Sequence, residues 1–194
     1  MIRLKYGNTN TFYVPGKSGG LLIDTDYAGT LQAFFRSLKM NHLELDDISY
    51  VLPTHCHPDH VGLMGELQKL GVKLLLVDIQ VAMVHFPDEI FGRDKHLRYV
   101  PIDEKQAAVI SCDESRDFLR AIGIEGEIIS TPSHSEDSVS VIMDCGDCFV
   151  GDLEPCEYLD GYNDNPQLEN DWDLLLSMKP KRILYAHANE KILD

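Results

Sequence analysis

The chain has 194 residues, 44% of them hydrophobic, and a net charge of −15 from 32 acidic and 17 basic residues. This length allows one domain with a substantial core, and so acidic a surface repels phosphate backbones and anionic lipids, which argues against nucleic-acid and membrane partners. No apolar run reaches the roughly 18–20 residues that cross a bilayer, and the start lacks the apolar stretch of a secretion signal, so we expect a cytoplasmic protein.

The first third of the chain is predicted to contain strands and one helix. Strand-like runs cover residues 2–6, 11–14 and 20–26. Apolar spacing of i, i+3, i+4 and i+7 predicts a helix whose core face is formed by Leu31, Phe34, Phe35 and Leu38. The mostly apolar run "ISYVLPT" is then expected to be a strand that leads directly into a histidine-rich segment.

The middle of the chain has two readable helices around a segment without a clear pattern. Helical spacing predicts a helix through Leu63, Met64, Leu67 and Leu70 that stops at Gly71, followed by a buried strand, "KLLLVD". Residues 79–110 are harder to interpret. We take "FPDEIFGRDKH" as a mobile loop or lid and expect this region to influence substrate choice. Ser111 and Glu114 have capping-box spacing and predict a helix after them.

The last third is predicted to hold the strands "EGEIIST", "SVSVIMD", "CFVGD" and "KRILYAH", with a helix over 168–178 before the last strand. Cys145 and Cys148 form a CxxC, but Gly146 and Asp147 between them indicate a hairpin turn rather than a redox or metal site. The five cysteines are an odd number, which argues against a disulfide framework. The order of elements favours one α/β domain over 1–194, layered with helices outside.

Candidate metal ligands crowd into "THCHPDH", which supplies His55, His57, Asp59 and His60. Imidazole and carboxylate are the usual ligands of zinc, iron and manganese. Four such close neighbours cannot all reach one ion with tetrahedral geometry, so the segment predicts two metals with further ligands from elsewhere. Candidates stand directly after later apolar strands, at His134, Asp152 and His187. His42, His85 and His96 are interpreted as surface or loop residues, and Cys56 as a packed thiol.

These motifs resemble the metallo-β-lactamase superfamily of binuclear metallohydrolases over nearly the whole chain. "THCHPDH" looks like the family's H-x-H-x-D-H signature, and "TPSHSEDSVS" like its T-P-G-H segment, with Ser133 in place of the usual glycine. "FVGDL" resembles the family's F-x-G-D-x-L motif, and "LYAHA" the strand that brings the final histidine. The resemblance implies an αββα four-layer sandwich with the site at one edge, between the two sheets.

The resemblance also implies a role for each candidate residue. The first metal would be held by His55, His57 and His134, and the second by Asp59, His60 and His187. Asp152 would bridge the two metals. Asp24, at the end of "LLID", would lie outside the ligand set and orient ligand histidines.

The activity implied is hydrolysis of a small ester-type substrate, such as a thioester or lactone, by a hydroxide that bridges two divalent metals, preferably zinc, with iron or manganese as alternatives. Asp59 would also relay a proton, and Tyr158 and Tyr162 are candidate substrate contacts. The alternatives are a persulfide-oxidising non-heme iron oxidoreductase of the same fold, a phosphodiesterase, which the acidic charge disfavours, and a binding module without turnover.

Two features of the sequence bear on these alternatives. Di-iron relatives tend to replace the second histidine of the signature with glutamate, but His57 is intact, which disfavours that branch. From the short segment after His187 we expect no extra domain of the kind that grips glutathione in some relatives, which disfavours that substrate. The same short segment also leaves a sheet edge or apolar surface to cover, from which we expect self-association into a homo-oligomer.

Overall fold

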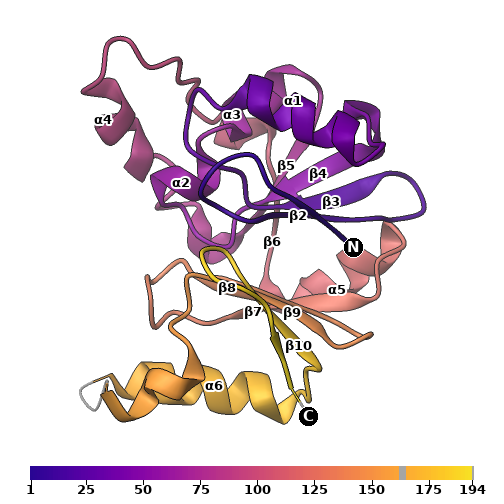
Figure 1. Cartoon of the computed structure of the whole chain (residues 1–194), viewed down its shortest axis with the longest axis vertical. Helices are drawn as coiled ribbons and strands as arrows, with labels where there is room; N and C mark the ends of the chain where they lie inside the picture. Colours follow the sequence, from indigo (N-terminus) through magenta and orange to yellow (C-terminus); the bar gives the residue numbers. More distant parts are fainter. Residues whose placement is uncertain (162–164, 194) are drawn as a thin grey trace.

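Two stacked sheets form the centre of the computed structural model, which describes residues 1–161 and 165–193 (Figure 1). The first sheet has the order β1-β2-β3-β4-β5-β6. Its strands are β1 (Ile2–Leu4), β2 (Thr11–Val14), β3 (Gly20–Ile23), β4 (Ile48–Leu52), β5 (Lys73–Val77) and β6 (Ala108–Ile110). The neighbours from β3 to β6 are parallel, so their carboxyl ends lie along the same edge of the sheet.

The second sheet has the order β11-β10-β9-β8-β7. Its strands are β7 (Gly126–Ser130), β8 (Val139–Met143), β9 (Asp147–Gly151), β10 (Arg182–Tyr185) and β11 (Lys191–Ile192). The pairs β7–β8 and β8–β9 are antiparallel, whereas β9 and β10 are parallel. The strands β7, β9 and β10 therefore all run in one direction and end at the same edge.

The helices lie on the outer faces of this pair of sheets, except for the one at 112–121, whose apolar residues pack into the core between the sheets. They are α1 (Leu31–Met40), α2 (Pro58–Val61), α3 (Met64–Lys69), α4 (Phe86–Gly92), α5 (Cys112–Ala121) and α6 (Pro166–Ser177). Short 3₁₀ turns are η1 (Leu45–Asp47), η2 (Asp78–Gln80), η3 (Glu104–Gln106) and η4 (Cys156–Gly161). In Figure 1, α1 and α3 lie over the first sheet and α6 lies under the second. Among the described residues, no helix has both the length and the apolar character that crossing a bilayer requires.

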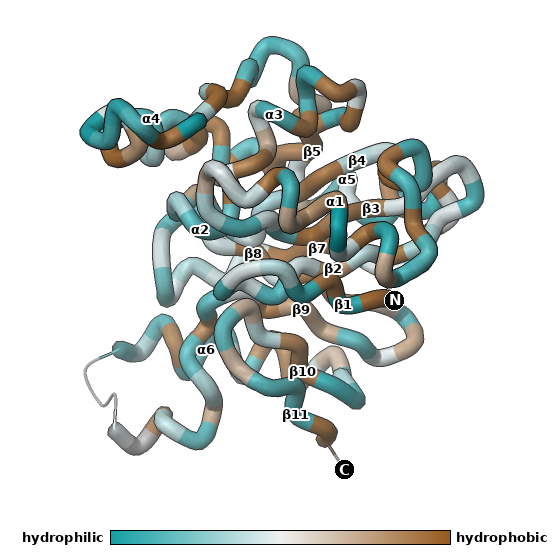
Figure 2. Tube along the Cα trace, turned by 45° about the horizontal axis from the view of Figure 1, so that its top comes forward, coloured by the Kyte–Doolittle hydropathy of each residue, from teal (hydrophilic) through white to brown (hydrophobic). Residues whose placement is uncertain are grey.

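Strand residues alternate between the layers, and this alternation creates three apolar cores. In β5, Leu74 and Leu76 face the helices α1 and α3, while Leu75 and Val77 face the second sheet. The third core lies between the second sheet and α6, where Trp172 is 1% exposed. Figure 2 shows the hydrophobic residues concentrated along the central strands. Each fully buried apolar side chain contributes about 1.5–3 kcal/mol to the stability of the fold. The layers that these cores join form the predicted αββα sandwich.

Local signals placed most of the helices and turns correctly. Ser111 caps α5, and its hydroxyl accepts the backbone N–H of Glu114, as the capping-box spacing predicts. The CxxC segment is a tight hairpin turn between β8 and β9 in which Gly146 has φ of 101°. Burial raises the pKa of the Cys148 thiol to about 12, so this thiol is a packed and unreactive group at neutral pH.

Other expectations need correction. Phe35, expected in the core, is 37% exposed because it lies at the border of the apolar stripe of α1. Part of the segment interpreted as a loop or lid is the helix α4. Its first turn contains Pro87, and a missing backbone N–H costs nothing there because the first N–H groups of a helix have no partner within it. The short strands β6 and β11 were not anticipated, since runs of three and two residues carry no readable alternation.

Candidate metal centre

The candidate ligands meet at the edge where the carboxyl ends of the strands from both sheets come together. His55 follows β4, and the turn that carries His134 follows β7. Asp152 follows β9 and His187 follows β10. At this edge the backbone N–H of Val139 donates to the carbonyl of Thr54 at 2.8 Å and ties the two sheets to each other. The geometry therefore agrees with the expectation that rigid strand ends present these groups to one cleft.

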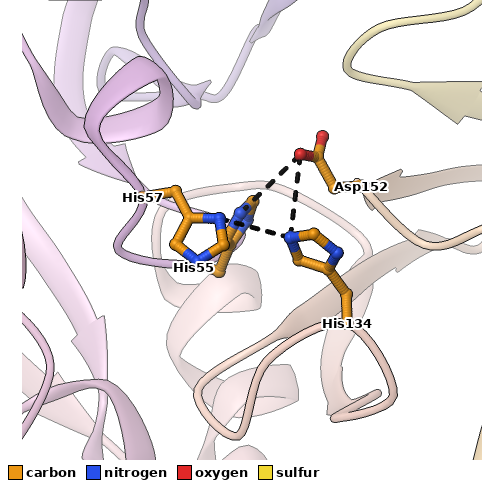
Figure 3. Close-up of side chains that lie close together, drawn as sticks. All are labelled: His55, His57, His134 and Asp152. Carbon is orange, nitrogen blue, oxygen red and sulfur yellow. Dashed lines mark hydrogen bonds and ion pairs between the residues drawn. The ribbon is translucent and has the colours of Figure 1, made fainter.

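Four of these side chains form a first cluster, drawn in Figure 3, whose members are His55, His57, His134 and Asp152. One donor atom from each lies within 4.8 Å of the others. Nε2 of His55 and Nε2 of His134 lie 3.9 and 3.8 Å from Oδ2 of Asp152. Nδ1 of His57 lies 3.2 Å from Nε2 of His134. The rings converge on a common point instead of packing against the core.

A second cluster lies on the other side of the same carboxylate and contains Asp59, His60 and His187. Nε2 of His187 lies 3.1 Å from Oδ2 of Asp59. Oδ1 of Asp152 lies 3.3 Å from Nε2 of His60 and 3.3 Å from Nε2 of His187. The two carboxylate oxygens of Asp152 therefore face different clusters.

Charge and burial shift the pKa values of different histidines in the centre in opposite directions. Burial and the neighbouring imidazoles lower the pKa of His55 well below its usual range, which keeps this ring neutral. Burial also acts to lower the pKa of His60, but the carboxylates of Asp24 and Asp152 outweigh it and raise that pKa to about 10. A hydrogen bond with His187 lowers the pKa of Asp59 to about 2. The centre thus combines the neutral ring of His55, the form that binds metals, with a His60 ring that its neighbouring carboxylates favour in the charged form and with the ionised carboxylate of Asp59.

Three of the donor atoms that face the centre make no hydrogen bond of good geometry, which tests whether a metal would fit. Nε2 of His55, Nε2 of His60 and Oδ1 of Asp152 are buried and have no hydrogen bond within the described part of the chain. Leaving such buried polar atoms unsatisfied costs about 1–3 kcal/mol each. Imidazole nitrogens and carboxylate oxygens are also the donor types that zinc and iron accept. The arrangement fits a pair of metal ions.

Asp24 lies where the sequence interpretation placed it, beside the second cluster. Its carboxylate accepts the backbone N–H of Thr54 at 2.6 Å and lies 3.1 Å from Nδ1 of His60. It is 1% exposed and adopts φ of 60°, a conformation that asparagine and aspartate tolerate better than most residues. Contact with Nδ1 leaves Nε2 of His60 directed at the centre.

Sequence reasoning missed a second buried carboxylate, Asp137, which joins two ligand-bearing segments. Its Oδ2 accepts the backbone N–H of Cys56 at 2.7 Å, between the two histidines of the signature. Its Oδ1 accepts the hydroxyl of Ser135, next to His134, at 2.8 Å. Asp137 therefore sets the spacing between the signature loop and the His134 turn. Cys56 itself is 1% exposed, and its thiol packs against the backbone of η2.

The segment before β2 fixes the remaining ligand positions. The hydroxyl of Thr9 donates to the carbonyl of Asp59 at 2.7 Å. The side-chain amide of Asn10 donates to the carbonyls of Tyr185 and Ala188, on either side of His187. Asn10 and the residues that it contacts are more than 170 positions apart in the chain, and the sequence offers no signal that pairs these two segments.

We expect Gly151→Ala to disturb the centre strongly, although the residue holds no metal. Gly151 has φ of 56°, and an added Cβ would lie 2.4 Å from Oγ1 of Thr54, the hydroxyl that donates to Asp24. The left-handed conformation alone costs alanine roughly 1–2 kcal/mol. At about 2–4 °C per kcal/mol for a chain of this size, the melting temperature should fall by at least about 2–8 °C. Thermal denaturation checks this, with Gly92→Ala as the control because its Cβ meets no atom within 4 Å. An unchanged melting temperature would contradict the contact.

A small hollow opens beside the two clusters. Its volume is about 230 Å³, and its walls include Leu153, Pro155, Tyr185 and Ala188 together with His134, Asp152 and His187. Tyr158 does not line this hollow but lies on an adjoining one, where it is 57% exposed. Tyr162, the other tyrosine considered as a substrate contact, lies outside the described residues.

Comparisons of the sequence and of the structure with known proteins agree with each other. The family model described as the metallo-beta-lactamase superfamily matches residues 4–187. A beta-lactamase-like protein 2 homolog from Drosophila melanogaster is 28% identical over 181 residues, which cover 93% of this chain and 59% of that protein. A probable metallo-hydrolase from Methanocaldococcus jannaschii is 28% identical over 146 residues, covering 72% of this chain and 65% of that one. The chain thus spans about three fifths of the length of these relatives.

Solved structures show the same fold. A metallo-beta-lactamase family protein from Thermus thermophilus superposes with a TM-score of 0.73 at 19% identity, covering 95% of this chain and 70% of that one. A second protein, solved in a di-iron-bound form, superposes with a TM-score of 0.73 at 22% identity and covers 99% of this chain and 94% of that one.

Proposed function

Because the chain belongs to the metallo-beta-lactamase superfamily, we propose that it is a metal-dependent hydrolase of small ester-type substrates. One observation carries the proposal: two clusters of histidine and aspartate donors share the carboxylate of Asp152. Such an arrangement serves two adjacent ions better than one. The clusters draw on both sheets, which also supports treating residues 1–194 as a single catalytic domain.

The proposed roles follow the two clusters. His55, His57 and His134 hold the first ion, while Asp59, His60 and His187 hold the second. Asp152 contributes one oxygen to each, in keeping with its Oδ2 and Oδ1 distances. When bound, such ions lower the pKa of water toward neutrality and polarise the oxygen of a substrate. Zinc suits this set because it combines readily with imidazole and carboxylate.

The chain's own side chains complete the chemistry. Asp59 remains ionised over the physiological range, because the hydrogen bond with His187 lowers its pKa to about 2. A carboxylate of such low basicity acts mainly as a charged ligand and would relay a proton only transiently. Asp24 and Asp137 fix the histidine rings and loops from outside, so the donor atoms need little rearrangement when substrate enters.

The hollow supports a small and uncharged substrate. At about 230 Å³ it is smaller than the roughly 300–1,000 Å³ typical of pockets for drug-sized ligands. Leu153, Pro155 and Ala188 give it apolar walls, and the only charged side chain there besides the candidate ligands, within the described residues, is the acidic Glu154. A thioester, a lactone or a related small ester fits these walls better than a phosphate ester, which the overall charge of −15 also disfavours.

A non-heme iron oxidoreductase of the persulfide-oxidising type is the second candidate. It is favoured by the clusters themselves, which present only nitrogen and oxygen donors, a set that suits iron as well as zinc. The likeness to a protein solved in a di-iron-bound form is a likeness of fold. The metal that the purified chain retains separates the two candidates.

We expect the purified protein to contain about two zinc ions per chain and to hydrolyse at least one of p-nitrophenyl acetate, an aliphatic thioester and a γ-lactone. His57→Ala should lower the metal content and abolish that hydrolysis, because it removes a donor from the first cluster. Elemental analysis and steady-state assays check both outcomes, with His96→Ala as the control because His96 is exposed in a loop away from the clusters.

Two results would contradict this proposal in different ways. One iron per chain would support the oxidoreductase instead. Absence of any metal affinity, or full hydrolysis by the His57→Ala variant, would mean that neither cluster is the site.

A further inference from the structure

Helix α6 carries a buried carboxylate, Asp171, that contacts the turn holding His134. Asp171 is 2% exposed. Its Oδ2 accepts the backbone N–H of Ser133 at 2.9 Å, and its Oδ1 accepts the side-chain amide of Gln167 at 2.8 Å. Ser133 directly precedes His134, so a residue on the outer layer of the sandwich reaches the first cluster through a single backbone bond.

The carboxylate of Asp171 is buried among neutral groups, and this burial costs free energy. Within the described residues it has no ion pair, and its two hydrogen-bond donors are both neutral amides. Removing a carboxyl group from water costs free energy, and hydrogen bonds from two neutral amides recover only part of that cost. The placement therefore points to a requirement for a fixed acceptor at this point.

The turn that carries His134 depends on few other anchors. Ser135, on the far side of His134, is held through its hydroxyl by Asp137. Thr131 and Ser138 close the base of the turn through the backbone at 3.0 Å. His134 itself is exposed and is not packed into a core, so its direction follows from the backbone on either side. Asp171 is the anchor on the amino-terminal side.

We propose that Asp171 is a positioning residue for the first metal position, and that α6 thereby controls occupancy of that position separately from the second. The inference rests on the proposed function, since it presupposes that the clusters bind metal. Ser133 and His134 contribute nothing to the second cluster, whose members are held by Asp24, Thr9 and Asn10. Losing the Asp171 bond should therefore weaken one position and leave the other unchanged.

The geometry also predicts which replacement preserves the function. In Asp171→Asn, the amide oxygen can accept the Ser133 N–H, and the amide nitrogen can donate to the carbonyl oxygen of Gln167 once that side-chain amide turns over. Both bonds survive while the negative charge is lost. In Asp171→Ala, both bonds are lost. Rescue by asparagine thus separates an effect of position from an effect of charge.

The test is titration of the chelator-treated protein with cobalt(II), followed by the visible absorption of the bound ion. We expect the unaltered chain to bind two equivalents in distinguishable steps. Asp171→Ala should weaken the step that His134→Ala abolishes by about 10-fold, the lower end of the range for losing a direct outer partner of a metal ligand, because Asp171 acts through the backbone of the preceding residue. The step that His187→Ala abolishes should not change. Asp171→Asn should remain within about threefold of the unaltered chain for both steps.

Two further variants keep the result interpretable. Asp173→Ala removes an exposed carboxylate from the same helix and should change neither step. Gln167→Ala removes only the second partner of Asp171 and should weaken the His134 step by less than Asp171→Ala does. If Asp171→Ala does not fold, judged by circular dichroism, the Gln167→Ala titration decides, and an unchanged His134 step there overturns the inference.

The remaining outcomes are equally decisive. Two cobalt steps in Asp171→Ala that match the unaltered chain would overturn the inference and leave the proposed hydrolase intact. Equal weakening of both steps would mean that Asp171 acts on the fold as a whole, and would also overturn it. Absence of cobalt binding by the unaltered chain would overturn the inference together with the metal centre on which it rests.

Discussion

Asp152→Ala should leave the chain with well under one tightly bound metal ion, and its hydrolysis should fall by more than the roughly 10–100-fold that follows loss of an outer hydrogen-bond partner. The reason is the position of this carboxylate, with Oδ2 facing His55 and His134 and Oδ1 facing His60 and His187. Among the described residues, no other carboxylate lies close to the donors of both clusters. Its removal takes a donor from each cluster at once, whereas replacing a single histidine affects one cluster.

Elemental analysis after dialysis, together with hydrolysis of the substrate found for the unaltered chain, measures this effect. Asp144→Ala is the matched control, because Asp144 is an exposed carboxylate at the turn before the same strand and pairs with Arg116. Circular dichroism establishes that both variants fold. Retention of two ions by folded Asp152→Ala would rule out a shared carboxylate and would point to two independent sites.

The largest effect on stability is expected from Trp172→Ala. Trp172 is 1% exposed between α6 and the second sheet, and its indole N–H donates to the carbonyl of Glu154 at 2.8 Å. Truncation of a buried tryptophan costs about 3–5 kcal/mol, which corresponds to a fall of about 6–20 °C in melting temperature for a chain of this size. The lost bond also frees the segment that follows Asp152.

Thermal and urea denaturation test this prediction. Leu174→Ala provides the control on the same helix, because Leu174 is 44% exposed and its truncation leaves no enclosed cavity. We expect the control to change the free energy of unfolding by no more than about 0.5 kcal/mol, as surface substitutions usually do. Similar losses in the two variants would show that α6 is not packed as the structure has it.

The sequence predicted those parts of the fold that have local causes. The capping spacing of Ser111 and Glu114 located the start of α5, because the two side chains satisfy backbone groups within one turn. The apolar runs that became β5 and β8 were readable since nearly every position is buried. The segment of helix α4 reads as a loop in the sequence, because its seven residues are too few to display a helical stripe and the second of them is a proline.

The candidate site was predictable in a different way. The seven donor positions could be named because the signature and the strand ends carry them, and the structure brings all seven into two adjacent clusters. Apart from Asp24, the groups that hold them could not be named. Asp137 and Asp171 bond to backbone N–H groups 81 and 38 residues away, and nothing local distinguishes them among the 32 acidic residues of the chain. Long-range pairing of this kind depends on the folded geometry.

Because the donors come from both sheets, ions bound at the proposed centre would hold the two sheets together in addition to taking part in the reaction. An ion that joins His57 to His134 closes a loop across 77 positions of the chain, as a crosslink would. Because ions bind the assembled edge and not the open chain, their binding energy adds to the cohesion of the two halves, by about 2.7 kcal/mol when the free ion is at 100 times its dissociation constant. Metal supply would then govern how long each molecule survives proteolysis, in addition to how fast it works.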